Sequence, residues 1–425
     1  MSKLLKHKEM IKTILIAVLV LSAVLLAGKA GYYSAISDKL RMGAGASDEG
    51  SLAADNIESF TGLRPFAVAV KPEDGGMLCV RYSYEEMTLT YSRLSVLLAE
   101  AIDSITTITK TDEPGWRNAI KNQSAYFCFY FRIPMSLLAL NLGVSDAELE
   151  GISATEILLS NEYGTTTLYF RDGADTYYAC ETDMGSSALS SAIEQFEGAS
   201  ASFAYEDEAH QKLAPYTIIS QSDYEISYLT ATSAFSDSFD CEPIFSSCGI
   251  NSKVMKSYPE NSGTVFVENN KTLRMNRDGS ASFSITSNAG EESGKAGAID
   301  IVSAVNLAVG LTSKVIAPNT GDASLVLSGV SFDEETSSYT ITMEYTVNGI
   351  LVSLKSGESA VTIVVQNGRI EKASFRALSF AVGRADTSVL ASAQAVAIAD
   401  ARGGYLRLSY AEDATGAFAC KWVVD

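Results

Sequence analysis

The longest uncharged stretch of the chain lies near its N-terminus. Thr13–Gly28 is the sixteen-residue run TILIAVLVLSAVLLAG, with Lys12 before it and Lys29 after it. As a helix, this run would extend about 24 Å, which is short of a hydrocarbon core of about 30 Å. Adding the neighbouring uncharged residues, with both lysine side chains extending toward water, gives the length that a span requires. The pattern therefore predicts a transmembrane anchor over residues 11–33.

The residues around the anchor predict its orientation. Four lysines and one glutamate precede the apolar run Thr13–Gly28, and an excess of lysine favours the cytoplasmic side of a membrane. We expect a single-pass cell-membrane protein with a cytoplasmic tail at residues 1–10, a polar tether at 34–58 and an extracytoplasmic bulk. A cleaved signal peptide is the alternative, because Gly28 and Ala30 are small residues at the positions that determine cleavage. Lys29 lies between them and the apolar run is long for a signal peptide, which favours a retained anchor.

Small residues recur along the predicted anchor. Ala23, Ala27 and Gly31 are spaced by four residues, and such a face allows two helices to approach closely in lipid. Alanine is common in membrane spans, so the same spacing also fits a helix without a partner. We treat these three residues as a candidate transmembrane partner face.

Beyond the tether, apolar residues follow the two-residue period of strands and the 3.6-residue period of helices. In the N-terminal exterior domain, predicted at 59–150, strands on either side of Glu73–Gly76 form a hairpin. A helix is predicted over Ser92–Thr106 and a strand over Ser124–Arg132. That strand, SAYFCFYFR, is apolar on both faces, so it should lie at the centre of a sheet.

A central domain is predicted at residues 151–235. Three strand-like runs with turn residues between them precede a helical run. These runs are Glu156–Asn161, Thr165–Arg171, Thr176–Glu181 and Met184–Phe196.

The remaining residues, 236–425, predict a C-terminal domain of hairpins and helices. Ala296–Ile316 and the alanine-rich Ser388–Arg402 are helical in period, and Arg369–Phe380 follows Asn367-Gly368 as a single strand. Hairpin-linked strands with few helices indicate antiparallel α+β domains and exclude a doubly wound parallel sheet. The predicted fold class is therefore α+β: one N-terminal transmembrane helix and a multidomain exterior of antiparallel sheets packed with helices.

The charge of the chain restricts its partners. The net charge is −19 at pH 7 and the first twelve residues contribute +3, so the rest carries −22. Such an acidic exterior argues against binding nucleic acid. Six cysteines are scattered without a CxxC pair. Cys241 and Cys248 are close enough in sequence to form a disulfide if the compartment is oxidising, and the sequence leaves open whether they do.

Candidate catalytic residues are few. Beyond the anchor the chain has one histidine, His210, in the acidic segment YEDEAH. A histidine-ligated metal needs further ligands and a nucleophile needs a positioned imidazole, so we interpret His210 as exposed and solvated. Glu291-Glu292 and Glu334-Glu335 are adjacent acids in predicted turns, where acids are usually solvated. With no GxSxG, HExxH or Walker motif, we predict no enzyme, no metal site and no cofactor.

Several short patterns occur in the order seen in one known family. They are Tyr130–Leu140, Thr264–Glu268 with Leu273–Met275 and Asp278–Ser280, Tyr339–Val347 with Asn348-Gly349, Val361–Gly368, Leu406–Tyr410 and Lys421–Val423. With one N-terminal membrane helix, they resemble the YycH family, membrane-anchored accessory proteins of the WalK sensor histidine kinase. Each pattern is weak, and their order over about 400 residues carries the resemblance. Ile350–Val352 departs from it, because family members often have a Pro-Val pair after this turn.

The resemblance implies a fold, partners and a mechanism. It implies a three-domain exterior whose last two domains share a small α+β topology, and a homologous partner called YycI. It also implies that the two anchors pack beside the membrane helices of the kinase and bias its signalling state in cell-wall homeostasis. Whether the chain also forms a homodimer stays open.

A different function is compatible with the same residues. The exterior would capture a wall-derived ligand or inhibit an exported hydrolase, and the helix would be a passive tether. A soluble fragment starting at Ser59 would then retain activity, whereas a regulator acting through its anchor would lose it.

Overall fold

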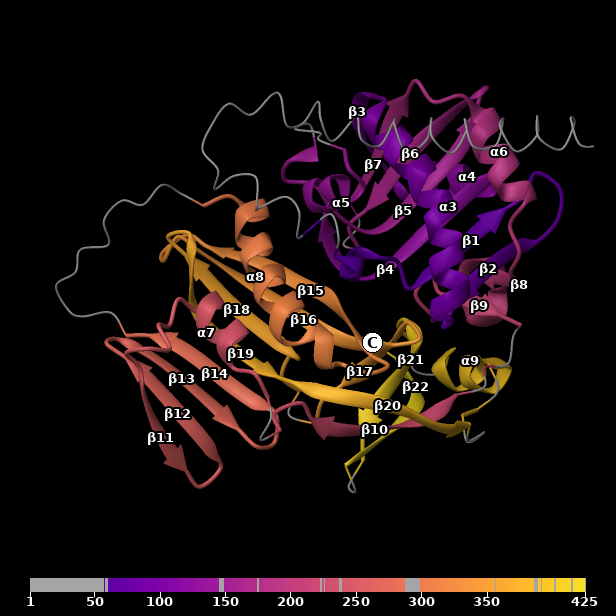
Figure 1. Ribbon diagram of the computed structural model, residues 1–425. Helices are drawn as coiled ribbons and strands as arrows, with labels where there is room; N and C mark the ends of the chain where they lie inside the picture. The colour runs from indigo at the N-terminus through magenta and orange to yellow at the C-terminus, as the bar shows by residue number, and fades with distance from the viewer. Residues whose placement is uncertain are drawn as a thin grey trace, which may run out of the picture. The chain divides into compact units, whose positions relative to one another are not determined.

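The doubly apolar strand lies inside a nine-stranded antiparallel sheet of the computed structural model (Figure 1). β4, Ser124–Pro134, pairs with β5 on one side and with β1 on the other. Tyr126, Phe127 and Cys128 are all buried, so both faces of the strand are covered. The predicted central position of this strand is confirmed.

The structure describes most of the chain after the tether. The described residues are 57, 60–144, 149–173, 176–221, 224, 226–236, 239–286, 299–355, 357–385, 389–390, 392–400, 403–413 and 416–424. The predicted tail, anchor and nearly all of the tether lie outside them.

The first sheet has the strand order β3-β7-β6-β5-β4-β1-β2-β8-β9. Neighbouring strands are antiparallel throughout. Its other strands are β1 (Ala67–Lys71), β2 (Met77–Arg81), β3 (Ile105–Thr111), β5 (Ser153–Glu162), β6 (Thr165–Arg171), β7 (Tyr177–Thr182), β8 (Ala199–Phe203) and β9 (Ile218–Ser220).

The helices of this region begin where the sequence supplies caps. Ser83 accepts a hydrogen bond from Glu86 N at the start of α3, Tyr84–Asp103. Asp112 accepts one from Gly115 N at the start of α4, Glu113–Lys121. Such caps satisfy amide groups that the first helical turn leaves free. Two shorter helices, α5 (Met135–Asn141) and α6 (Ser186–Glu194), also pack on the sheet.

One predicted helix is wrong in both bounds. The run assigned to Ser92–Thr106 belongs to α3, which starts at Tyr84, and the chain then forms strand β3 from Ile105. Met87 and Tyr91 are buried, so the apolar stripe of α3 extends further toward the N-terminus than predicted. β3 was not predicted, because its sequence ITTITKT lies at the sheet edge with mostly exposed threonines and gives no buried alternation.

Aromatic rings fill the core between α4 and the sheet. The Trp116 side chain is fully buried. Its ring lies 6.0–6.4 Å, centroid to centroid, from the four tyrosines Tyr126, Tyr169, Tyr177 and Tyr216. Rings at these distances and steep angles make favourable edge-to-face contacts in addition to the area they bury.

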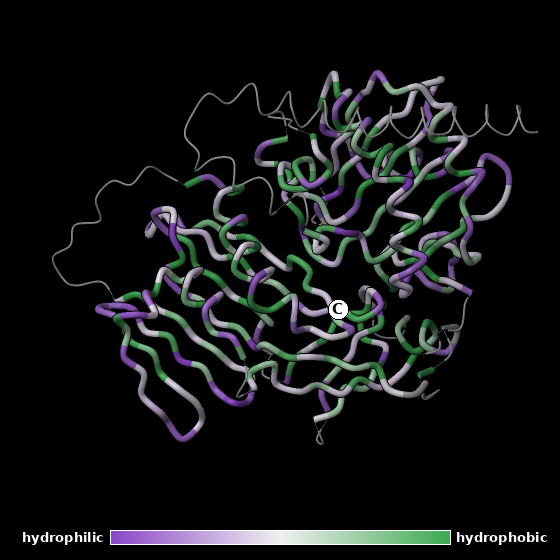
Figure 2. The backbone as a smooth tube through the Cα atoms, viewed as in Figure 1, coloured by the Kyte–Doolittle hydropathy of each residue, from purple (hydrophilic) through white to green (hydrophobic). Residues whose placement is uncertain are grey.

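The second sheet is larger, with the order β11-β12-β13-β14-β19-β18-β16-β17-β21-β22-β10-β20, and β15 pairs with β16 outside this path. It is antiparallel except for the parallel pair β17–β21. Figure 2 shows hydrophilic residues at the hairpin tips of β11–β14. The strands are β10 (Ser227–Ser233), β11 (Lys256–Glu260), β12 (Gly263–Glu268), β13 (Lys271–Asn276), β14 (Ser280–Ile285), β15 (Ser324–Asp333), β16 (Ser338–Val347), β17 (Ile350–Ser353), β18 (Val361–Gln366), β19 (Arg369–Arg376), β20 (Leu378–Ala385), β21 (Leu406–Glu412) and β22 (Ala417–Val424).

Helix α8, Ile301–Val315, covers this sheet and contacts β16, β18 and β19. Val305, Val309 and Thr312 of its predicted stripe are buried. Short α7 (Glu242–Ser247) packs beside α8, and α9 (Ser392–Asp400) corresponds to the predicted alanine-rich helix.

Two predictions in this sheet need correction. The run Arg369–Phe380 is not one strand: β19 pairs with β14 and β18, and β20 pairs with β10 after a one-residue break at Ala377. β11 was not predicted, because all five of its side chains are exposed and Pro259 weakens the strand pattern.

The mixed α+β class with antiparallel sheets is confirmed for the described residues. Strands from both predicted ranges 59–150 and 151–235 lie in the first sheet, and β10 crosses into the second. Contacts group residues 53–425 as one compact unit.

Tyr82 links the two sheets. It directly follows β2 and has a left-handed backbone, with φ +58°. Its hydroxyl accepts hydrogen bonds from the Arg81 guanidinium and from the backbone N–H of Leu408 on β21, the latter at 2.9 Å. Its ring lies edge-on to Tyr224 and to Trp422 of β22, at centroid distances of 5.1 and 6.5 Å.

Further contacts surround this link. The Cys128 Sγ and the Tyr405 hydroxyl are 3.2 Å apart, and the Tyr130 hydroxyl donates to the carbonyl of Gly349. Near β15, a Cβ on Gly62 would lie 2.5 Å from the carbonyl oxygen of Leu325. Contacts this close require a fixed arrangement of the two sheets.

We expect Tyr82→Phe to lower the free energy of unfolding by about 1–3 kcal/mol, because the Leu408 N–H and one Arg81 donor would be left buried without an acceptor. Urea unfolding of the full chain in detergent, followed by tryptophan fluorescence, measures it. The matched control is Tyr84→Phe, which removes a hydroxyl from a side chain that is 52% exposed. Equal unfolding midpoints for both variants would contradict the linking role of Tyr82.

Candidate functional site

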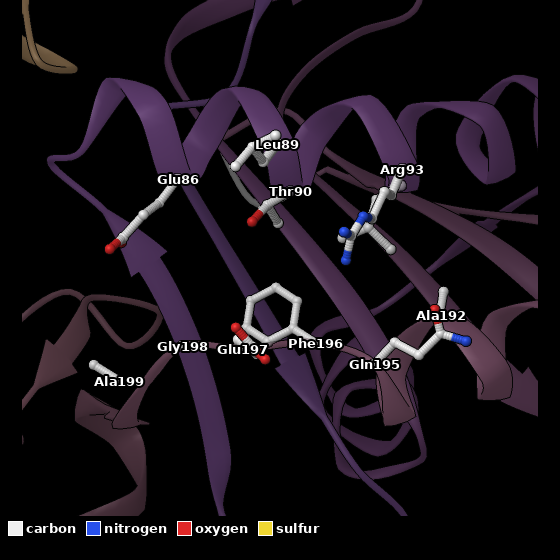
Figure 3. A pocket seen from close by; sticks show the side chains of 11 residues that line it. Glu86, Leu89, Thr90, Arg93, Ala192, Gln195, Phe196, Glu197, Gly198 and Ala199 are labelled. Carbon is white, nitrogen blue, oxygen red and sulfur yellow. The ribbon is translucent and has the colours of Figure 1, made fainter.

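A groove of about 560 Å³ lies between α3 and the segment that follows α6. Figure 3 shows the ring of Phe196 beneath α3, with Glu86 and Arg93 extending from different turns of that helix. Its lining residues are Glu86, Leu89, Thr90, Arg93, Leu94, Ala192, Gln195, Phe196, Glu197, Gly198 and Ala199.

The groove follows the exposed face of α3. Leu89 and Val96 are 58% and 50% exposed and lie seven residues apart, on the helix face opposite Tyr91 and Leu94. Leu89 lines the groove, and with Val96 two turns further along α3 it forms an exposed apolar surface suited to contact with another molecule.

Three charged side chains line the groove. Among the described residues, none of Glu86, Arg93 and Glu197 is in an ion pair within 4 Å. Glu86 lies in the first turn of α3, where a carboxylate is stabilised by the helix dipole. The groove therefore offers apolar area together with charges of both signs.

Gly198 allows the groove floor to approach β2. A Cβ at this position would lie 2.7 Å from the carbonyl oxygen of Cys79 and 2.7 Å from the Phe196 ring. Real Cβ atoms do not approach so closely, so glycine is required for this packing.

The lining contains few groups that could take part in covalent chemistry. It has one hydroxyl, that of Thr90, and no histidine, cysteine or lysine. The Glu86 and Glu197 carboxylates are the candidate bases of the lining.

The predicted partner face Ala23, Ala27 and Gly31 lies outside the described residues. Among the described residues, one helical stretch, Ile301–Asn319, is long and apolar enough to cross a membrane, with a mean hydropathy of 1.5. It contains α8, which covers the second sheet, and 56% of the stretch is buried there.

His210 is less exposed than predicted. Its side chain is 22% exposed, and its Nε2 lies 3.6 Å from the Asp207 carboxylate. It lies in a single turn, Glu208–His210, that contacts α9. This packing explains why a histidine in an acidic segment is half-buried.

The other titratable candidates are dispersed. Glu334 and Glu335 are exposed in the turn before β16, whereas residues 291–292 lie outside the described part. Within the described ranges no cluster of three or more His, Cys, Asp or Glu side chains is placed to hold a metal ion.

None of the six cysteines forms a disulfide. The Cys241 Sγ lies 3.9 Å from the Met275 sulfur. The disulfide between Cys241 and Cys248 that the sequence left open is not formed. Burial raises the pKa of Cys128 and of Cys248 to about 12. Both thiols are therefore protonated and unreactive at neutral pH.

Sequence reasoning missed the groove because it placed the start of α3 at Ser92. Glu86 and Leu89 then lay outside any predicted helix. The signal was present: Leu89 and Val96 repeat at the seven-residue spacing of one helix face, opposite the buried stripe.

Comparisons with known proteins give one informative match. No protein-family model and no curated protein sequence matches the chain. The crystal structure of YycH from Bacillus subtilis matches with a TM-score of 0.54 and 11% identity, over 84% of this chain and 92% of that chain. The chain has a YycH-like fold. The YycH resemblance seen in the sequence is thereby confirmed at the level of the fold.

We expect Gly198→Ala to lower the free energy of unfolding by about 1–3 kcal/mol, because the added methyl group must displace Phe196 or β2. Gly76→Ala is the matched control, since a Cβ there meets nothing within 4 Å. Thermal unfolding of both variants tests this, and a Gly198→Ala midpoint equal to that of the control would show that the floor of the groove is loosely packed.

Proposed function

We propose that this chain is a membrane-anchored extracytoplasmic accessory regulator of a WalK-like sensor histidine kinase, acting with a YycI-like partner. The observation that carries the proposal is the YycH-like fold, which extends over 84% of the chain. The order of short sequence patterns and the predicted N-terminal anchor support it independently.

The mechanism requires two packing states of the kinase membrane helices. If the anchor packs better against one state, it shifts the balance toward that state. A coupling free energy of about 1–3 kcal/mol changes the ratio of the states by roughly 5–150-fold. Ala23, Ala27 and Gly31 are the proposed contact face, because small side chains allow the closest approach of two helices.

The exterior would hold and orient this helix through protein–protein contacts. Its acidic surface disfavours nucleic acid as a partner. A catalytic role is not proposed. The buried thiols of Cys128 and Cys248 are protonated at neutral pH, and within the described residues the one acid in ion-pair distance of His210 is Asp207.

Replacing Ala27 and Gly31 with leucine should change kinase output several-fold, because the larger side chains block close helix contact while keeping the span apolar. Ser22→Leu is the matched control: at 100° per residue it makes a similar change on the other side of the predicted helix. Output is measured with a reporter of the response regulator, and protease accessibility confirms the surface display of each variant.

Photo-crosslinkers at positions 22–31 identify the neighbour directly. Capture of the kinase or of a YycI-like protein from 23, 27 and 31, but not from 22, is the expected result. Unchanged output in the double leucine variant, with normal display, would contradict signalling through the anchor.

A further inference from the structure

The hairpin between β5 and β6 departs from the turn chemistry of two other hairpins in the chain. Its two turn residues, Tyr163 and Gly164, have φ values of +51° and +91°. Two other two-residue hairpin turns, Asn348-Gly349 and Asn367-Gly368, have nearly the same φ values and use asparagine first. Asparagine tolerates the left-handed region, whereas a bulky aromatic side chain there is an outlier.

Tyr163 also contributes nothing visible to the core. It is fully exposed, the most exposed of the large hydrophobic side chains in the described part of the chain. None of the aromatic contacts in that part includes its ring. A residue that is unfavourable for its turn and unused in packing suggests that the ring serves a function.

A hollow of about 450 Å³ lies beside this ring. Its lining combines two tyrosines with neutral amides and one carboxylate, and it contains no lysine or arginine. The lining residues are Gly115, Asn118, Asn122, Asn161, Glu162, Tyr163 and Tyr169.

The carboxylate in the hollow is held in place by the protein. Glu162 Oε1 accepts hydrogen bonds from the Tyr169 hydroxyl at 2.9 Å and from Asn122 Nδ2 at 3.3 Å. Its Oε2 makes no hydrogen bond within the described part of the chain, and neither does the side chain of Asn118. The residues that carry the fixed carboxylate, the amide group and the exposed ring therefore line one hollow.

We propose that this hairpin tip is a binding site for a neutral saccharide. A pyranose presents a face of C–H groups and a rim of hydroxyl groups. The Tyr163 ring takes the C–H face, and the Glu162 carboxylate and Asn118 amide take hydroxyl groups. The carboxylate, with no cation in the lining, disfavours phosphorylated and acidic sugars.

The site binds its ligand without cleaving it. Glycoside hydrolysis ordinarily requires two carboxyl groups flanking the bond, and the lining supplies Glu162 alone. The inference is independent of the proposed kinase regulation, because it concerns the exterior and its test does not measure signalling.

The test uses the full chain in detergent micelles, titrated with the neutral tetrasaccharides of β-glucose, α-glucose and N-acetylglucosamine, and with an oligogalacturonate as the acidic comparison. Calorimetry or ligand-observed NMR gives the affinities. We expect at least one neutral tetrasaccharide to bind in the millimolar range or tighter, and more tightly than the acidic one.

Tyr163→Asn separates binding from folding. Asparagine suits the turn, so the thermal midpoint should stay equal or rise, while the affinity falls about tenfold with the loss of the ring. Tyr163→Phe, which keeps the ring, should stay within about twofold of the native affinity. Tyr258→Asn removes a half-exposed tyrosine on β11, far from this hairpin in sequence, and should leave binding unchanged.

Three results would overturn the proposal. The first is the absence of binding by every neutral saccharide at millimolar concentration. The second is a Tyr163→Asn affinity equal to that of Tyr258→Asn. The third is a lower thermal midpoint for Tyr163→Asn, which would assign the ring a structural role. Crosslinking from position 163 to a protein with no saccharide binding would replace the proposed ligand with a protein partner.

Discussion

The arrangement of the two sheets depends on one buried tyrosine hydroxyl. Tyr82 accepts from Arg81 of the first sheet and from Leu408 of the second. Arg81 also donates to the carbonyl of Ile218 at 2.7 Å and lies over the Tyr82 ring at 4.1 Å. Within the described residues no carboxylate lies within ion-pair distance of this buried guanidinium, so backbone, hydroxyl and ring together take the place of a counter-ion. This group of contacts holds Tyr82 in a backbone conformation that a bulky residue rarely adopts.

The sequence predicted those strands and turns whose structure is determined by residues close together in the chain. β4 was predictable because the run Ser124–Arg132, which is apolar on both faces, allows few positions other than the inside of a sheet. Asn348-Gly349 and Asn367-Gly368 were predictable because their turns need positive φ at both residues. β3 and β11 were not, since edge strands bury little and their side chains carry no alternating signal.

The contacts between distant segments could not be predicted in the same way. Nothing near Tyr82 in the sequence indicates that its hydroxyl meets Leu408, which follows 326 positions later. The groove on α3 depended on where that helix begins, and its start is set by the Ser83 cap. The identity of 11% over 84% of the chain, at a TM-score of 0.54, shows that a similar fold is compatible with largely different residues.

Two tyrosines in the left-handed region show how structural and functional constraint can be told apart. Tyr82 and Tyr163 have φ values of +58° and +51°. Tyr82 is 8% exposed, and its ring and hydroxyl are both engaged, so the fold itself accounts for the unfavourable backbone. Tyr163 has the same backbone cost, but its side chain is fully exposed. No contact within the described part of the chain offsets this cost. A contact with a ligand would explain why tyrosine occupies this position, and the polar hollow that Tyr163 lines is where that contact can form.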